Sequence, residues 1–191
     1  MTFLSNLITG ISLGSIYAII ALGYTMVYGI AKMLNFAHGD VIMVGAYICF
    51  YAISSFNLPP VVGVLLAVLV CTILGVVIER LAYKPLRSAP SLAVLITAIG
   101  VSYFLQNAAL LLFSSAPKVF PSIMGDKSLQ LFGGQLTISA VTIVTVVSCI
   151  VIMVALTLFT GKTKMGKAMR ACSEDKGAAQ LMGISVNFTI S

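Results

Sequence analysis

The feature that most constrains this chain is the spacing of its charged residues. Four stretches contain no Asp, Glu, Lys or Arg: residues 1–31, 41–78, 88–117 and 128–161. A helix that crosses the hydrocarbon core of a bilayer needs about 20 mostly apolar residues, and a charge at its centre costs at least about 2.5 kcal/mol. Because each stretch is long enough to cross a bilayer, the sequence predicts an integral membrane protein.

The composition excludes a water-soluble domain and argues against an enzyme. Hydrophobic residues make up 60% of the chain and charged residues 8%, whereas soluble domains carry about 25% charged residues. One histidine and five acidic residues, without metal-ligand or nucleophile–base spacing, offer no catalytic centre. Cys49, Cys71, Cys149 and Cys172 show no CxxC spacing, so we expect free buried thiols rather than disulfides or a metal site.

Five spans follow from the charge-free stretches and from one pair of prolines. Pro59 and Pro60 divide the second stretch, because proline removes a backbone donor and forces the preceding residue out of helical geometry. The predicted spans cover residues 3–30, 35–56, 61–78, 92–113 and 136–159. The expected fold is an all-α polytopic helical bundle that forms a single transmembrane domain over residues 1–191.

The basic residues predict how these spans are oriented. If the spans alternate, nine of the 11 Lys and Arg residues share one side: Lys32, Arg80, Lys84, Arg87, Lys162, Lys164, Lys167, Arg170 and Lys176. Lys118 and Lys127 lie on the other side. The positive-inside rule then places the N-terminus outside and the segment after Gly161 in the cytoplasm. Basic residues that face an anionic leaflet account for the net charge of +6, so nucleic acid is not an expected partner.

Small and polar residues inside two spans indicate packing and buried hydrogen bonds. Gly10, Gly14 and Ala18 recur every four residues in the first span, a stripe that lets two helices approach closely and favours packing over chemistry. Gln106 and Asn107 lie deep in the fourth span. Because unpaired amides are costly there, we expect both to face the protein interior or a wet path. Interhelical hydrogen bonding and substrate contact both stay open for this pair.

Residues 29–40 mark a break before the second span. A helix over residues 41–56 alone would reach about 24 Å at 1.5 Å per residue, short of a hydrocarbon core near 30 Å, so it should begin earlier. Asn35 is its predicted N-cap, and Asp40 one turn in suits the positive end of the helix dipole. His38, on the same turn, is either a structural hydrogen-bonder or a substrate contact. The candidates for lining a translocation path are Asn35, His38, Asp40, Gln106 and Asn107.

Two further segments flank the fifth span. Residues 128–138 alternate in polarity around Gly133 and Gly134, which predicts a small hairpin outside the membrane. After the span, residues 166–183 combine helix formers, basic residues and apolar positions, with Gly183 as a C-terminal cap. This predicted short cytoplasmic helix either rests on anionic lipid or docks into a separate protein.

Six motifs distributed along the chain indicate a family. They are GSIYAIIALGYTMVYG at 14–29, LNFAHG at 34–39, GAY at 45–47, ERLAYKPLR at 79–87, RACSED at 170–175 and LMGI at 181–184. Together they resemble the LivH-type permease of bacterial branched-chain amino-acid ABC importers. The resemblance implies a coupling loop over residues 166–184, with the candidate residues Gly166, Arg170, Glu174, Asp175, Ala178 and Gly183. The short acidic-alanine signature of the family is present in degenerate form at residues 174–179.

The resemblance also implies what the chain works with. The expected partners are a second permease subunit, cytoplasmic ATP-binding subunits, an extracytoplasmic substrate-binding protein and the lipid bilayer of the bacterial inner membrane. No cofactor is expected in this chain, since a separate subunit uses the ATP. Relatives continue through further spans beyond the position of Ser191, so we expect the N-terminal part of a permease. The alternatives are an importer permease for urea or short amides and an ATP-independent channel or facilitator.

Overall fold

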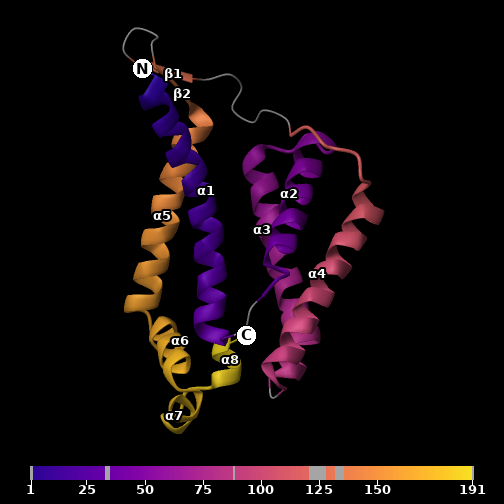
Figure 1. Ribbon diagram of the computed structural model, residues 1–191, viewed down its shortest axis with the longest axis vertical. Coiled ribbons are helices and arrows are strands. Elements are labelled where there is room, and N and C mark those ends of the chain that lie inside the picture. Colours follow the sequence, from indigo (N-terminus) through magenta and orange to yellow (C-terminus); the bar gives the residue numbers. More distant parts are fainter. Residues whose placement is uncertain (1, 33–34, 88, 121–127, 132–135, 191) are drawn as a thin grey trace. The chain divides into compact units, whose positions relative to one another are not determined.

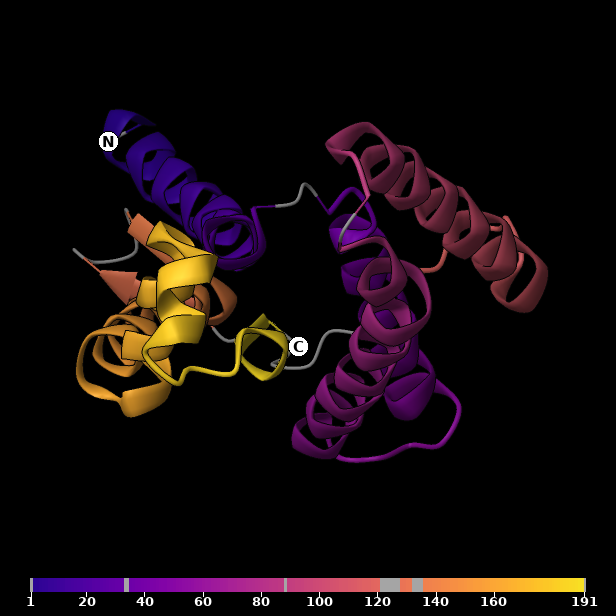
Figure 2. The same cartoon turned by 90° about the horizontal axis from the view of Figure 1, so that it is seen from below.

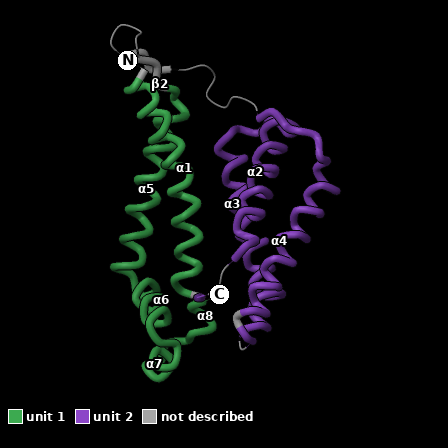
Figure 3. The backbone as a smooth tube through the Cα atoms, in the orientation of Figure 1, with its two compact units in different colours: residues 1–31, 124–190 green, residues 32–123, 191 purple. Residues whose placement is uncertain are grey.

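The computed structural model describes residues 2–32, 35–87, 89–120, 128–131 and 136–190. These residues form two compact units, one with residues 1–31 and 124–190 and one with residues 32–123, drawn in different colours in Figure 3. Each unit has its own set of packed helices and is described separately below.

The first unit is a pair of long helices with short elements at both ends. Helix α1 (Thr2–Ala31) lies beside α5 (Ala140–Lys162), as Figure 1 shows. At one end, strand β1 (Ser128–Leu131) pairs antiparallel with β2 (Leu136–Ser139). At the other end, three short helices gather, as both Figure 1 and the view from below in Figure 2 show: α6 (Lys164–Glu174), α7 (Lys176–Leu181) and α8 (Val186–Ile190).

The second unit is built on two neighbouring helices, α2 (His38–Ser54) and α3 (Pro60–Ile78). The chain continues from α3 through a π-helical turn, η1 (Glu79–Tyr83), and a 3-10 turn, η2 (Lys84–Leu86). Helix α4 (Ser91–Phe113) lies against α2 and η1. A small core of Ala37, Ile78 and Leu105 joins the segment before α2 to the end of α3 and the middle of α4.

The helices confirm an all-α polytopic membrane protein. In the described part of the chain, four helical segments are long and apolar enough to cross a membrane: residues 3–30, 60–86, 92–113 and 140–162. The second predicted span, residues 35–56, corresponds to α2, a shorter apolar helix of 17 residues. Large apolar side chains along these helices are mostly exposed, as expected for helices whose surroundings are lipid or other membrane helices.

Two predicted boundaries are corrected by the structure. Helix α2 begins at His38, and its N-cap position is Ala37, so the prediction of Asn35 as the N-cap is wrong. The fifth span begins at Ala140 rather than at residue 136, because residues 136–139 form β2. The hairpin itself is confirmed, and its register pairs Leu131 with Leu136. That register is centred on Gly133 and Gly134, which lie outside the described residues.

Candidate functional site

A buried carboxylate joins α2 to α4. Asp40 lies in the first turn of α2, as predicted, and only 8% of its surface is exposed. The Ser102 hydroxyl donates a hydrogen bond to Asp40 Oδ2 at 2.5 Å, and Gln106 Nε2 donates to Asp40 Oδ1 at 3.1 Å. Ser102 and Gln106 are one helical turn apart on α4, so both donors reach the same carboxylate. The structure thus places two of the predicted path residues, Asp40 and Gln106, in one cluster.

A second contact between α2 and α4 lies further along both helices. The rings of Tyr47 and Phe113 stack with centroids 4.4 Å apart. Because Asp40 meets Ser102 and Tyr47 meets Phe113, the contacts follow the same order along the two helices. Helices α2 and α4 therefore run in the same direction, as the alternation of successive spans requires.

Asn35 fixes the segment that leads into α2. Its side-chain Oδ1 accepts a hydrogen bond from the backbone N–H of Ala37, two residues on, at 3.1 Å and one from the Tyr83 hydroxyl at 2.8 Å. The first bond is a local turn that competes with capping a helix. The second ties this segment to η1, which an ion pair between Arg87 and Glu79 also holds. Asn35 therefore anchors the predicted break rather than capping the helix.

The remaining predicted path residues are not brought into one site. His38 is half-buried at the start of α2, and its backbone N–H donates to the Asn35 carbonyl at 3.2 Å. Asn107 is exposed and donates to the Tyr103 carbonyl of its own helix at 2.8 Å. Gln106 is also exposed in this chain, and the expectation that both amides face the protein interior or a wet path stays a prediction. The Gln106 amide still makes the interhelical bond that was one of its two predicted roles.

The small-residue stripe of α1 has no partner within the described residues. Gly10, Gly14 and Ala18 are all exposed, and a Cβ atom added at either glycine would meet nothing within 4 Å. The close helix approach that the stripe predicts is therefore not made here, and its packing role stays a prediction.

The predicted coupling segment consists of two helices rather than one. Helix α6 ends at Glu174 and α7 begins at Lys176, with Asp175 between them in an extended conformation. Asp175 Oδ1 accepts hydrogen bonds from Gly177 N at 2.7 Å and from Ala178 N at 3.1 Å, so it caps α7. A cap leaves the helical φ/ψ region while its side chain pairs the first free amides. The single helix predicted over residues 166–183 is therefore wrong in this respect.

Gly183 ends α7, as predicted. Its φ of +79° lies in the left-handed region that glycine adopts without strain. Its N–H donates to the Gln180 carbonyl at 3.1 Å, and the N–H of Ile184 donates to the Ala179 carbonyl at 3.0 Å. These two bonds form a Schellman motif, which satisfies carbonyls at the end of a helix.

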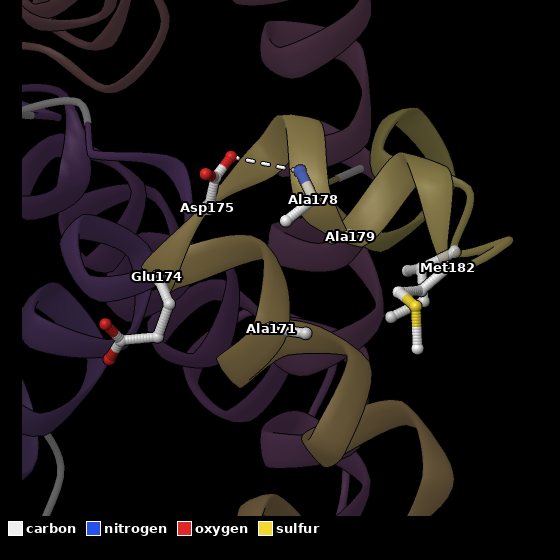
Figure 4. A pocket seen from close by; sticks show the side chains of 7 residues that line it. Ala171, Glu174, Asp175, Ala178, Ala179 and Met182 are labelled. Carbon is white, nitrogen blue, oxygen red and sulfur yellow. Dashed lines mark hydrogen bonds between the residues drawn. The ribbon is translucent and has the colours of Figure 1, made fainter.

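An open hollow of about 290 Å³ lies over the break between α6 and α7 (Figure 4). Its lining residues are Ala171, Glu174, Asp175, Ala178, Ala179, Met182 and Ile184. Three of the lining residues are alanines, and two, Glu174 and Asp175, are acidic. The large apolar side chains of Leu181 and Met182 are 90% and 83% exposed. Arg170, in contrast, is exposed on α6 and does not line the hollow.

The comparison with known families covers nearly the whole chain. The family model of the permease component of branched-chain amino acid transport systems matches residues 6–191. The chain belongs to this family. Both the cluster around Asp40 and the hollow over Asp175 lie inside the matched residues.

The curated relatives carry the same family name. The high-affinity branched-chain amino acid transport system permease protein BraD of Pseudomonas aeruginosa is 40% identical, with 99% of this chain and 65% of BraD aligned. The permease proteins called LivH from Salmonella typhimurium and Escherichia coli K12 are 39% and 38% identical, over the same shares. This chain thus spans just under two thirds of the length of these relatives. No solved structure matches.

Proposed function

We propose that this chain is part of the permease subunit of an ATP-binding-cassette importer and forms part of the translocation path for branched-chain amino acids. Family membership supports a transport role, and the names of the relatives point to the substrate class. In this proposal the chain is a single transmembrane permease domain and not an enzyme. A second permease subunit, cytoplasmic ATP-binding subunits that use the ATP, and an extracytoplasmic substrate-binding protein complete the transporter.

The proposed orientation places the N-terminus outside and the α6–α7 segment in the cytoplasm. The basic residues of α5, α6 and α7 support it, since Lys and Arg accumulate on the cytoplasmic side of membrane proteins. The end of α3 belongs to the same side, because Arg80, Lys84 and Arg87 follow it.

The α6–α7 segment supports the proposal that a separate ATPase drives the transporter. Its hollow is lined by small and apolar side chains and by two acidic residues, Glu174 and Asp175. Anionic headgroups are repelled by carboxylates, so this surface suits a protein groove better than a bacterial lipid surface. The exposed Leu181 and Met182 are suitable apolar anchors for such a groove.

Replacing Ala178 with Arg in the complete transporter tests the docking role. Ala178 lines the hollow and is exposed in this chain, so the variant should insert and fold. An unpaired charge buried against a partner costs several kcal/mol, and we expect co-purification of the ATP-binding subunit to be lost. Gln180→Arg is the matched control, because Gln180 is an exposed residue of α7 that does not line the hollow.

The two variants also separate docking from lipid anchoring. A lipid anchor would gain affinity from both substitutions, since each adds one positive charge near the anionic leaflet. If the surface docks into the ATP-binding subunit, only Ala178→Arg should lose that subunit, because only Ala178 lines the hollow. Wild-type recovery of the ATP-binding subunit with Ala178→Arg would contradict the proposed docking surface.

A further inference from the structure

Asp40 is the only charged side chain that the described residues bury. It belongs to an apolar helix of a membrane protein, where an ionisable group is costly and where such groups face the protein interior or a water-filled path. The carboxylate therefore requires an explanation beyond the packing of α2 against α4.

The hydrogen-bond partners of Asp40 are neutral. Ser102 and Gln106 each donate one hydrogen bond to it, and neither carries a charge. Within the described part of the chain, the ion pair joins Arg87 to Glu79, and no basic side chain pairs with Asp40. A buried charge without a counter-ion is strongly destabilising, so the ionised carboxylate would favour a cation supplied from outside the chain.

Gln106 gives the cluster an accessible side. The residue is exposed, and its amide nitrogen is shared between Asp40 Oδ1 and Ser102 Oγ at 3.1 Å each. This arrangement fixes the amide and leaves its carbonyl oxygen as a further acceptor. The carboxylate and this carbonyl are oxygen acceptors, the kind of group that pairs with a donor of several hydrogen bonds such as a primary ammonium.

We propose that Asp40, positioned by Ser102 and assisted by Gln106, binds the ammonium group of the transported amino acid. This inference rests on the proposed function and assigns one end of the substrate to named residues. A neutral substrate such as urea or a short amide could hydrogen-bond this carboxylate but would not neutralise its charge.

The substitution Asp40→Asn separates charge from hydrogen bonding. An Asn amide donates to Ser102 Oγ while its carbonyl accepts from Gln106, so both interhelical bonds are kept and only the charge is lost. In proteoliposomes that hold the complete transporter and its binding protein, uptake of radiolabelled leucine should fall about 10-fold or more. Recovery of the assembled complex should stay at the wild-type value, and the melting temperature should stay the same or rise, because the buried charge without a counter-ion is removed.

Two further variants complete the test. Asp40→Glu keeps the charge and should retain more uptake than Asp40→Asn, although it fits the hydrogen bonds less well. Thr97→Val is a matched deletion of a polar group on α4, where the Thr97 hydroxyl donates only to the Ala93 carbonyl of its own helix, and it should transport like wild type.

The outcomes distinguish the subsite from the function on which it rests. A wild-type transporter that does not import leucine would contradict the proposed function itself. Wild-type import together with equal import by Asp40→Asn would overturn only the ammonium subsite and indicate a neutral, structural carboxyl group. An Asn variant that no longer assembles would also overturn it, because the charge would then serve the fold.

Discussion

The close packing at the junction of α5 and α6 predicts that Gly166 cannot be replaced by alanine without loss of stability. Thr163 separates the two helices, accepts a hydrogen bond from Gly166 N at 2.9 Å and donates one to the Phe159 carbonyl at 2.6 Å. A Cβ atom at Gly166 would lie 2.4 Å from the Phe159 oxygen and 2.5 Å from two backbone atoms of Thr160. Backbone atoms inside a helix cannot rotate away, so Gly166→Ala must push α6 away from the end of α5.

The size of the effect follows from two costs. Forcing an extra methyl group into a packed site costs about 1–3 kcal/mol, and losing the Thr163 cap costs about 1 kcal/mol more. A destabilisation of about 2–4 kcal/mol lowers the melting temperature by roughly 4–16 °C, because 1 kcal/mol corresponds to about 2–4 °C in a protein of this size. The measurement is thermal unfolding of the purified permease in detergent.

Gly161→Ala is the matched control and should have the opposite sign. A Cβ atom at Gly161 would meet only the Arg170 guanidinium, at 3.9 Å, which is an ordinary contact. Gly161 lies within α5, where replacing glycine by alanine stabilises a helix by about 0.5–1 kcal/mol. Equal melting temperatures for the two alanine variants would refute the close approach of α6 to α5.

Two further predictions concern the second unit and the orientation of the chain. Tyr83→Phe removes the hydrogen bond to Asn35 and should lower the free energy of unfolding by about 0.5–1.5 kcal/mol, measured by thermal unfolding. Tyr103 is exposed and its hydroxyl makes no hydrogen bond in the described part of the chain, so Tyr103→Phe should leave the stability unchanged. Equal losses for the two variants would contradict the role of Asn35 as an anchor. A cysteine at Lys118 should react with a membrane-impermeant probe from outside and one at Gln180 only from the cytoplasm, and the reverse pattern would overturn the proposed orientation.

The long helices could be predicted because their signal is local. A span of apolar residues needs no knowledge of its neighbours, and the predicted fourth span, 92–113, differs from α4 by a single residue at its start. The proline pair likewise placed the start of the third span at residue 61, one residue after α3 begins at Pro60, since proline suits the first helical turn. The same reasoning failed for the start of α2, because Asn35 forms a local turn and a bond to Tyr83 instead of a cap.

The break at Asp175 could have been anticipated from the residue types. Asp is a preferred N-cap, and it precedes a run with two alanines that ends at a glycine. The helix formers and apolar positions of residues 166–183 nevertheless predict one continuous helix. What decides the matter is that Asp175 Oδ1 pairs two amides of α7, a contact that only the extended conformation of Asp175 permits.

The cluster around Asp40 was beyond sequence reasoning for a different reason. Ser102 and Gln106 are four residues apart and so share a face of α4, but that face gives no indication of which helix it meets. The partner is 62 residues away in the chain for Ser102 and 66 for Gln106, and only the packing of α2 against α4 brings them together. In a membrane helix, where most side chains are apolar, a polar residue indicates a hydrogen-bonded contact but does not show which residue is its partner. The polar residues Asp40, Ser102 and Gln106 can therefore be recognised one by one in the sequence, and as a cluster only once the helices are packed.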